Sequence, residues 1–82
     1  MTKVLSVAHL REMVQAGKHD FFVCSYLGLR SSKYINLLQD GRFSIVNEAD
    51  DTEDVLTEED IMDKRMTNVG EAITKGAFWC YE

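Results

Sequence analysis

Residues 32–46, SKYINLLQDGRFSIV, decide the fold of this chain. Two runs that suit β-strands, 32–38 and 43–46, are separated by Gln39-Asp40-Gly41-Arg42. Asp-Gly between such runs favours a β-hairpin, because both turn residues tolerate a positive φ. Residues 21–27, FFVCSYL, are also rich in aromatic and β-branched residues, which predicts a further strand before the hairpin. The sequence therefore predicts a three-stranded antiparallel meander.

A helix is predicted on the N-terminal side of this meander. Apolar residues recur three and four positions apart, at Val7, Leu10, Met13 and Val14. Ser6 is a favourable N-cap, and Gly17 supplies the left-handed residue that ends many helices. We expect an amphipathic helix over residues 7–16.

Two short helices are predicted after the meander. Thr57 and Asp60 resemble a capping box, and Lys64 and Arg65 lie near the other end of this first short helix. A second start falls at Thr67 or Asn68. That helix is expected to end at Gly76.

The remaining segments complete the predicted fold. Residues 47–56 are expected to form an acidic connection, and residues 77–82, AFWCYE, a last strand or an aromatic tail packed across the meander. The predicted fold is α+β: an N-terminal helix, a three-stranded antiparallel meander, two short helices and a C-terminal strand or aromatic tail. The helices are expected to cover one face of the sheet.

Length and composition restrict the class of protein. The 82 residues, of which 45% are hydrophobic, suffice for one small domain spanning 1–82. No stretch approaches the roughly 20 apolar residues of a membrane span, and a secretory signal is not evident, so we expect a cytoplasmic protein. Cys24 and Cys80 are too few for a disulfide scaffold or a four-ligand zinc site. We expect free thiols, no metal site and no cofactor.

Charge is distributed unevenly along the chain. Residues 1–47 contain six Lys/Arg and three Asp/Glu, whereas residues 48–82 contain three Lys/Arg and eleven Asp/Glu. The net charge of -5 therefore combines a mildly basic part with a strongly acidic one. Because the cations are scattered and form no basic stripe, direct binding of nucleic acid is not expected.

The segment 28–33 is a candidate anion-binding loop. A glycine, two hydroxyl groups and two cations occur together at Gly28, Arg30, Ser31, Ser32 and Lys33. Backbone amides and charge-assisted hydrogen bonds from such residues can hold a phosphate or carboxylate. The segment lacks the glycine pattern of a P-loop or dinucleotide site, and an ordinary solvated hairpin connection is the alternative.

A catalytic cysteine is the less favoured interpretation of a second group of residues. Cys24 follows His19 and Asp20, so the three residue types of a nucleophilic site are present. Cys24 is embedded among Phe22, Val23 and Tyr26, where a buried inert thiol is the usual outcome. No catalytic residue is therefore assigned.

Two segments are candidate contact surfaces for a partner. Asp50, Asp51, Glu53 and Asp54 form an extended array of carboxylates that could engage a basic protein or imitate the phosphates of DNA. Strand alternation places some of the C-terminal aromatic residues on an outer face, which makes Trp79 and Tyr81 candidates for a partner or dimer contact.

The order of several segments resembles small uncharacterised proteins carried on conjugative transposons and related mobile elements of Gram-positive bacteria. The segments are His19-Asp20-Phe21-Phe22, residues 28–33, residues 47–51, residues 56–59 and residues 67–78. The resemblance assigns no activity to any residue. It implies an accessory gene, a setting in which small acidic proteins often act by binding other proteins.

The sequence therefore predicts a non-enzymatic accessory protein, a monomer or homodimer, that binds an unidentified protein partner. The acidic segment and an exposed aromatic edge are the expected contact surfaces. The alternatives are a small-anion or nucleotide-binding protein that uses the 28–33 loop, and an acidic mimic of DNA.

Overall fold

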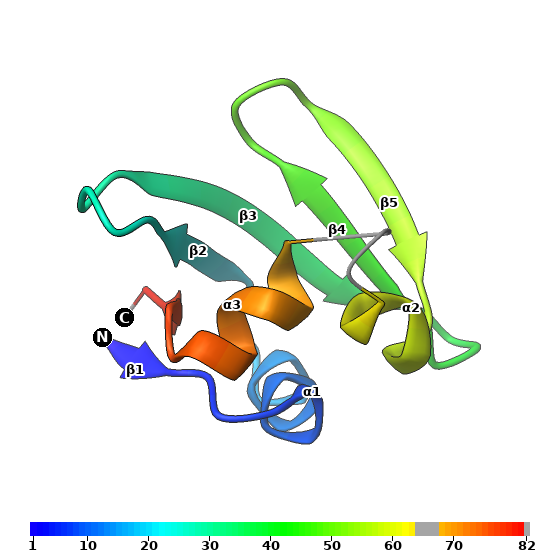
Figure 1. Ribbon diagram of the computed structural model, residues 1–82. Helices are drawn as coiled ribbons and strands as arrows, with labels where there is room; N and C mark the ends of the chain where they lie inside the picture. Colours follow the sequence, from blue (N-terminus) through cyan, green and yellow to red (C-terminus); the bar gives the residue numbers. More distant parts are fainter. Residues whose placement is uncertain (64–67, 82) are drawn as a thin grey trace.

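In the computed structural model, which describes residues 1–63 and 68–81, six antiparallel strands form one sheet with three helices on one of its faces (Figure 1). The order of the strands across the sheet is β1-β6-β2-β3-β4-β5. The strands are β1 (Thr2–Lys3), β2 (Asp20–Cys24), β3 (Arg30–Leu37), β4 (Phe43–Asn47), β5 (Thr52–Leu56) and β6 (Phe78–Cys80). The helices are α1 (Val7–Gln15), α2 (Glu58–Met62) and α3 (Val69–Lys75).

The predicted three-stranded meander is wrong, although the domain is α+β. Strands β2, β3 and β4 are consecutive neighbours, but β5 extends the sheet beyond β4 and β6 pairs with the other side of β2. The short strand β1 then pairs with β6, so the segments at the two ends of the chain lie side by side. Pairing between residues distant in sequence therefore enlarges the sheet.

Strand β5 arises within the segment that the sequence predicted as a connection. Asp51 adopts a left-handed conformation with φ of 57°, and its amide donates to the carbonyl oxygen of Asn47 at 2.8 Å. Asp50 accepts hydrogen bonds from the amide and hydroxyl of Thr52. This tight turn aligns residues 52–56 with β4, and Leu56 becomes buried opposite Phe43.

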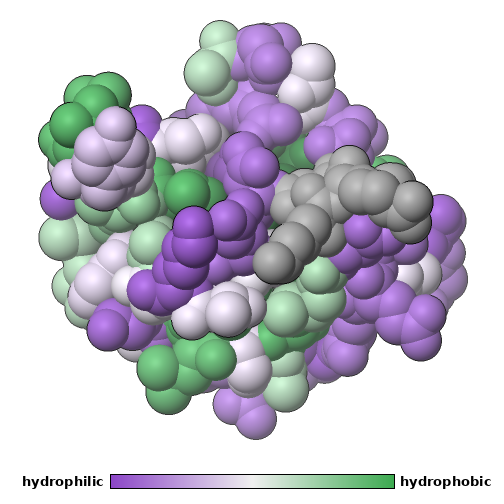
Figure 2. All heavy atoms as spheres, viewed as in Figure 1, coloured by the Kyte–Doolittle hydropathy of each residue, from purple (hydrophilic) through white to green (hydrophobic). Residues whose placement is uncertain are grey.

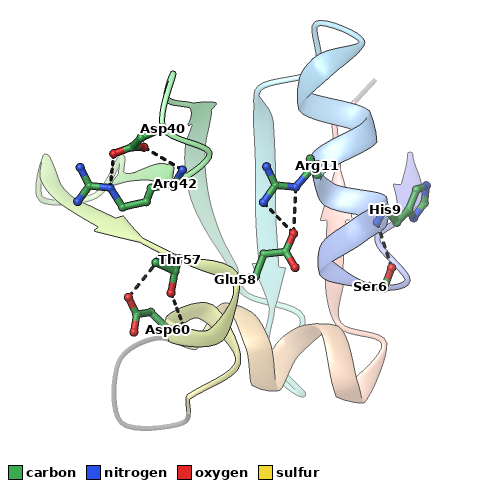
Figure 3. A network of polar contacts seen from close by, with 8 residues as sticks. All are labelled: Ser6, His9, Arg11, Asp40, Arg42, Thr57, Glu58 and Asp60. Atoms are coloured by element: carbon green, nitrogen blue, oxygen red, sulfur yellow. Dashed lines mark hydrogen bonds and ion pairs between the residues drawn. The ribbon is translucent and has the colours of Figure 1, made fainter.

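The predicted N-terminal helix is observed as α1. The Ser6 hydroxyl accepts a hydrogen bond from the His9 amide at 3.0 Å (Figure 3). The chain leaves the helix through Gly17, which has a φ of 93°. Arg11, in the middle of α1, forms an ion pair with Glu58 of α2 at 2.7 Å. This partly exposed pair joins the first and second helices at the surface.

Replacing Ser6 with alanine removes the side-chain acceptor at the start of α1. We expect a loss of about 1 kcal/mol in the free energy of unfolding, since the His9 amide then loses its partner. In a domain of this size the midpoint of thermal unfolding should fall by about 4–8 °C. Circular dichroism checks this, with Ser31→Ala in β3 as the matched control. An equal change in both variants would contradict the role of the cap.

The two predicted short helices differ in how they begin. Thr57 and Asp60 form the predicted capping box at the start of α2 (Figure 3). Helix α3 begins after Asn68, whose side chain makes no capping hydrogen bond, and ends at Gly76 with φ of 70°. Lys64 and Arg65, predicted for the end of the first short helix, and Thr67, the alternative start of the second, lie outside the described residues.

One hydrophobic core fills the space between the sheet and the helices. Burial of apolar surface is the main stabilising contribution to such a fold. The strands contribute Phe21, Ile35, Phe43, Ile45, Leu56, Phe78 and Cys80, and the helices contribute Val7, Leu10, Met13, Val14, Ile61, Val69, Ala72 and Ile73. The opposite face of the sheet carries no helix in the described part of the chain (Figure 1).

Candidate functional site

The loop between β2 and β3, residues 25–29, presents large apolar side chains to solvent. The exposed fractions of Tyr26, Leu27 and Leu29 are 96%, 68% and 68%. Figure 2 shows hydrophobic side chains on the lobe that this loop occupies in Figure 1. Three large apolar side chains exposed within four positions are a feature of many interaction sites.

Hydrogen bonds centred on Ser25 determine the shape of this loop. Its hydroxyl oxygen accepts from the amides of Leu27 and Leu29 at 3.3 and 3.2 Å. Its amide donates to the carbonyl oxygen of Leu29, and Gly28 donates to the carbonyl oxygen of Ser25, both at 2.9 Å. Gly28 takes a positive φ of 80°, which a glycine tolerates. The predicted strand 21–27 is therefore wrong beyond Cys24, because this turn holds Tyr26 and Leu27 outside the sheet.

A groove with a volume of about 540 Å³ lies beside the loop. Its lining includes Cys24 and Tyr26, Ala72 of α3, Ala77, and Trp79 of β6. Glu71 and Lys75, which also line it, form an ion pair at 2.8 Å. The groove therefore combines an apolar wall with a charged rim, the arrangement found in many protein interfaces.

The aromatic residues predicted as a partner contact lie on the helix-free face of the sheet. Tyr81 packs on Phe22 with a ring distance of 4.5 Å, and Arg30 covers the Phe22 ring at 4.6 Å. The Nζ atom of Lys3 lies 5.3 Å from the Trp79 ring centre. Trp79 and Tyr81 are consequently half-buried beneath cations. Trp79 also lines the groove, together with Tyr26 of the loop.

The four side chains predicted to bind an anion do not converge. Residues 30–33 belong to β3 and not to a loop, so their side chains alternate between the two faces. Arg30 and Ser32 lie on the helix-free face, where the Ser32 hydroxyl is 3.2 Å from that of Tyr81. Ser31 and Lys33 lie on the opposite face.

Lys33 is buried and forms part of a polar chain at the edge of the core. Only 7% of the residue is exposed, and its ammonium group donates to the side-chain oxygen of Asn47. The side-chain amide of Asn47 donates to the Thr52 hydroxyl oxygen, and the Thr52 hydroxyl donates to the Asp50 carboxylate at 2.8 Å. Burial lowers the pKa of Lys33, and the carboxylates of Asp50 and Asp54 oppose part of this shift. The period-two pattern of the strand, which sets Lys33 beside Ile35, could have revealed this burial.

The predicted acidic contact residues occupy the β4–β5 hairpin. Asp50 and Asp51 lie in its turn, and Glu53 and Asp54 lie on β5. Hydrogen bonds from the Thr52 hydroxyl and amide lower the pKa of the Asp50 carboxyl group. Glu53 accepts a hydrogen bond from the buried Ser44 hydroxyl at 2.6 Å. Figure 2 shows mostly hydrophilic side chains where β5 and α2 lie in Figure 1.

His19 and Cys24, the residues of the catalytic-cysteine alternative, form hydrogen bonds with different partners. His19 makes a hydrogen bond through Nδ1 with the carbonyl oxygen of Ile35 at 2.8 Å and stacks on Tyr34. The Cys24 thiol donates to the carbonyl oxygen of Ser25 at 3.6 Å. Both cysteines are free thiols. The imidazole therefore has partners other than the thiol, in contrast to the pairing that nucleophilic catalysis requires.

Residues 1–63 and 68–81 contain no group of three or more His, Cys, Asp or Glu side chains that could hold a metal ion. None of the helices in this part of the chain has the length and apolar character needed to cross a membrane. Comparison with protein families, with curated protein sequences and with solved structures finds no match to this chain.

Proposed function

We propose that this protein is a non-enzymatic accessory protein that binds a protein partner through the loop 25–29 and the adjoining groove, together called the loop–groove surface. The observation that carries the proposal is the exposure of Tyr26, Leu27 and Leu29 in one loop whose shape is fixed by Ser25. A preformed apolar loop binds without a large loss of conformational entropy, because its backbone is already ordered.

The proposed occupant is an apolar segment of another protein. Burying one exposed leucine contributes about 1.5–3 kcal/mol, so Leu27 and Leu29 together can supply a large part of a binding free energy. The groove accepts apolar side chains against Ala77 and Trp79, and the ion pair of Glu71 and Lys75 supplies a polar rim. The net charge of -5 favours a cationic partner over a second copy, since two copies repel each other.

The test identifies the partner by its contact with the loop. A photo-crosslinking amino acid replaces Leu27 in one sample and the exposed Lys18 in a control sample, and cross-linked proteins from host cells are identified by mass spectrometry. The affinity of the purified partner is then measured for the wild type, for Leu27→Ser/Leu29→Ser and for the control Leu5→Ser/Leu38→Ser. The control also replaces two exposed leucines, but away from the groove.

We expect the loop variant to weaken partner binding by about 100-fold or more, because two buried leucines are lost. The control variant should bind within about twofold of the wild type, since Leu5 and Leu38 do not line the groove. Equal affinities of the loop variant and the wild type would overturn the proposal. So would a stable wild-type dimer that the loop variant dissociates in sedimentation experiments, because the surface would then serve self-association.

A further inference from the structure

Strand β5 forms the longer of the two open edges of the sheet. It spans Thr52–Leu56 and is the last strand in the order, whereas β1 at the other edge has two residues. Among residues 1–63 and 68–81, no strand pairs with the outer side of β5. Thr52, Glu53, Asp54 and Val55 are exposed. An open strand of this kind presents unpaired backbone groups that another extended segment can bind.

The pairing of the inner strands shows which backbone groups of β5 point outward. The amide of Glu48 donates to the carbonyl oxygen of Ser32, and the amide of Leu38 donates to the carbonyl oxygen of Arg42. These bonds show that the backbone amide and carbonyl groups of the even-numbered residues 42–48 point toward β3. The backbone groups of residues 43, 45 and 47 therefore point toward β5. Their partners on β5 are residues 56, 54 and 52. The amides and carbonyl groups of Glu53 and Val55 therefore point away from the sheet.

The charge of this edge selects among possible occupants. Residues 43–63 contain nine Asp and Glu residues and no Lys or Arg. On β5 itself, Glu53 and Asp54 lie on opposite faces, and Val55 lies on the same face as Glu53. Pairing of two β5 strands from two copies would set carboxylates against carboxylates, which disfavours a second copy. A cationic extended segment meets opposite charge on both faces.

We propose that the β5 edge binds a basic extended segment of a protein, which adds to the sheet as a seventh strand. The four outward backbone groups of Glu53 and Val55 supply the main-chain hydrogen bonds. In an antiparallel arrangement, an apolar residue faces Val55, and two successive cationic residues face Asp54 and Glu53. This surface is separate from the loop–groove surface, so the inference goes beyond the proposed function and stands without it.

Synthetic peptides test the strand addition. The probe is a blocked peptide of sequence TVKRTT, and the control is TVEETT with reversed charge. Binding is followed by amide chemical shifts and hydrogen exchange of the full chain. We expect TVKRTT, but not TVEETT, to slow exchange of the Glu53 and Val55 amides, and the affinity should fall as salt is raised. Unchanged exchange at these two amides under saturating peptide would overturn the proposal, as would shifts confined to residues 25–29.

A proline substitution separates strand addition from charge attraction alone. Val55→Pro removes an outward amide but no hydrogen bond to β4, and Val55→Thr keeps the amide. We expect Val55→Pro to weaken TVKRTT binding about tenfold relative to Val55→Thr, since one backbone hydrogen bond is lost. A TVKRTT peptide methylated on the backbone amide of its arginine, the residue that faces Glu53, gives the same comparison on the wild type without any change in the protein. Equal affinity of the methylated and unmethylated peptides would contradict main-chain pairing.

Discussion

Replacing Phe21 with alanine is expected to lower the free energy of unfolding by about 3–5 kcal/mol, whereas Phe22→Ala should cost less than about 2 kcal/mol. The two side chains are adjacent on β2, and both are almost completely buried, at 0% and 2% exposure. Burial alone therefore predicts equal losses. The expected difference comes from what covers each ring.

Phe21 is enclosed by the core between sheet and helices, where it stacks on Phe78 at 5.6 Å. Its neighbours are held in place from several directions, so removal of the ring leaves a cavity that cannot close. Phe22 lies on the helix-free face and is covered by Arg30 and Tyr81. The long arginine side chain can settle into the vacated space, because its charged end remains in solvent.

Urea unfolding followed by circular dichroism measures both losses. A domain of this length has a stability of roughly 4–12 kcal/mol, so Phe21→Ala is close to the limit of folding. Phe21→Leu provides a milder variant, for which a loss of about 1–2 kcal/mol keeps the protein folded. Equal losses for Phe21→Ala and Phe22→Ala would show that the helix-free face is packed as rigidly as the core.

The elements fixed by neighbouring residues could be predicted from the sequence. The Asp-Gly turn and the flanking runs correctly indicated the pairing of β3 with β4. Ser6 marked the start of α1, and the capping box at Thr57 marked the start of α2. Each of these features depends on contacts within a few residues, which composition and spacing describe directly.

The larger sheet could not be predicted in the same way. Strand β6 lies between β1 and β2, where Phe78 and Cys80 join a core built from all the elements, and local spacing does not describe such long-range contacts. Residues 52–54 carry two acids and a threonine, a composition that indicates a solvated connection. Their pairing with β4 depends on the turn that Asp51 closes, so tertiary context overrides local preference.

The candidate surfaces were only partly predictable. Charge separation along the chain indicated the acidic segment, and Trp79, which the sequence predicts as a partner contact, lines the groove. The exposed loop was missed, because Tyr26 and Leu27 continue an aromatic and aliphatic run that favours a strand. The turn depends on the Ser25 hydroxyl binding two amides ahead of it. A serine followed three residues later by glycine was the available signal for this turn.

Replacing Gly70 with alanine is expected to lower the free energy of unfolding by about 3 kcal/mol, at the upper end of the cost of overpacking. Gly70 lies in α3 where that helix crosses α2. An added Cβ atom would lie 2.2 Å from the carbonyl oxygen of Ile61 and 2.8 Å from the Cα atom of Met62. Both are backbone atoms, so the conflict can be relieved only if one helix moves away from the other.

Gly28→Ala is the matched control, because nothing lies within 4 Å of the Cβ position there. Its φ of 80° alone opposes the substitution, at a cost of about 1 kcal/mol. The midpoint temperature of thermal unfolding should therefore fall by about 4–8 °C for Gly28→Ala and by at least twice as much for Gly70→Ala. A smaller fall for Gly70→Ala than for the control would mean that α2 and α3 separate easily. The two helices would then not support the α3 side of the groove as a rigid wall.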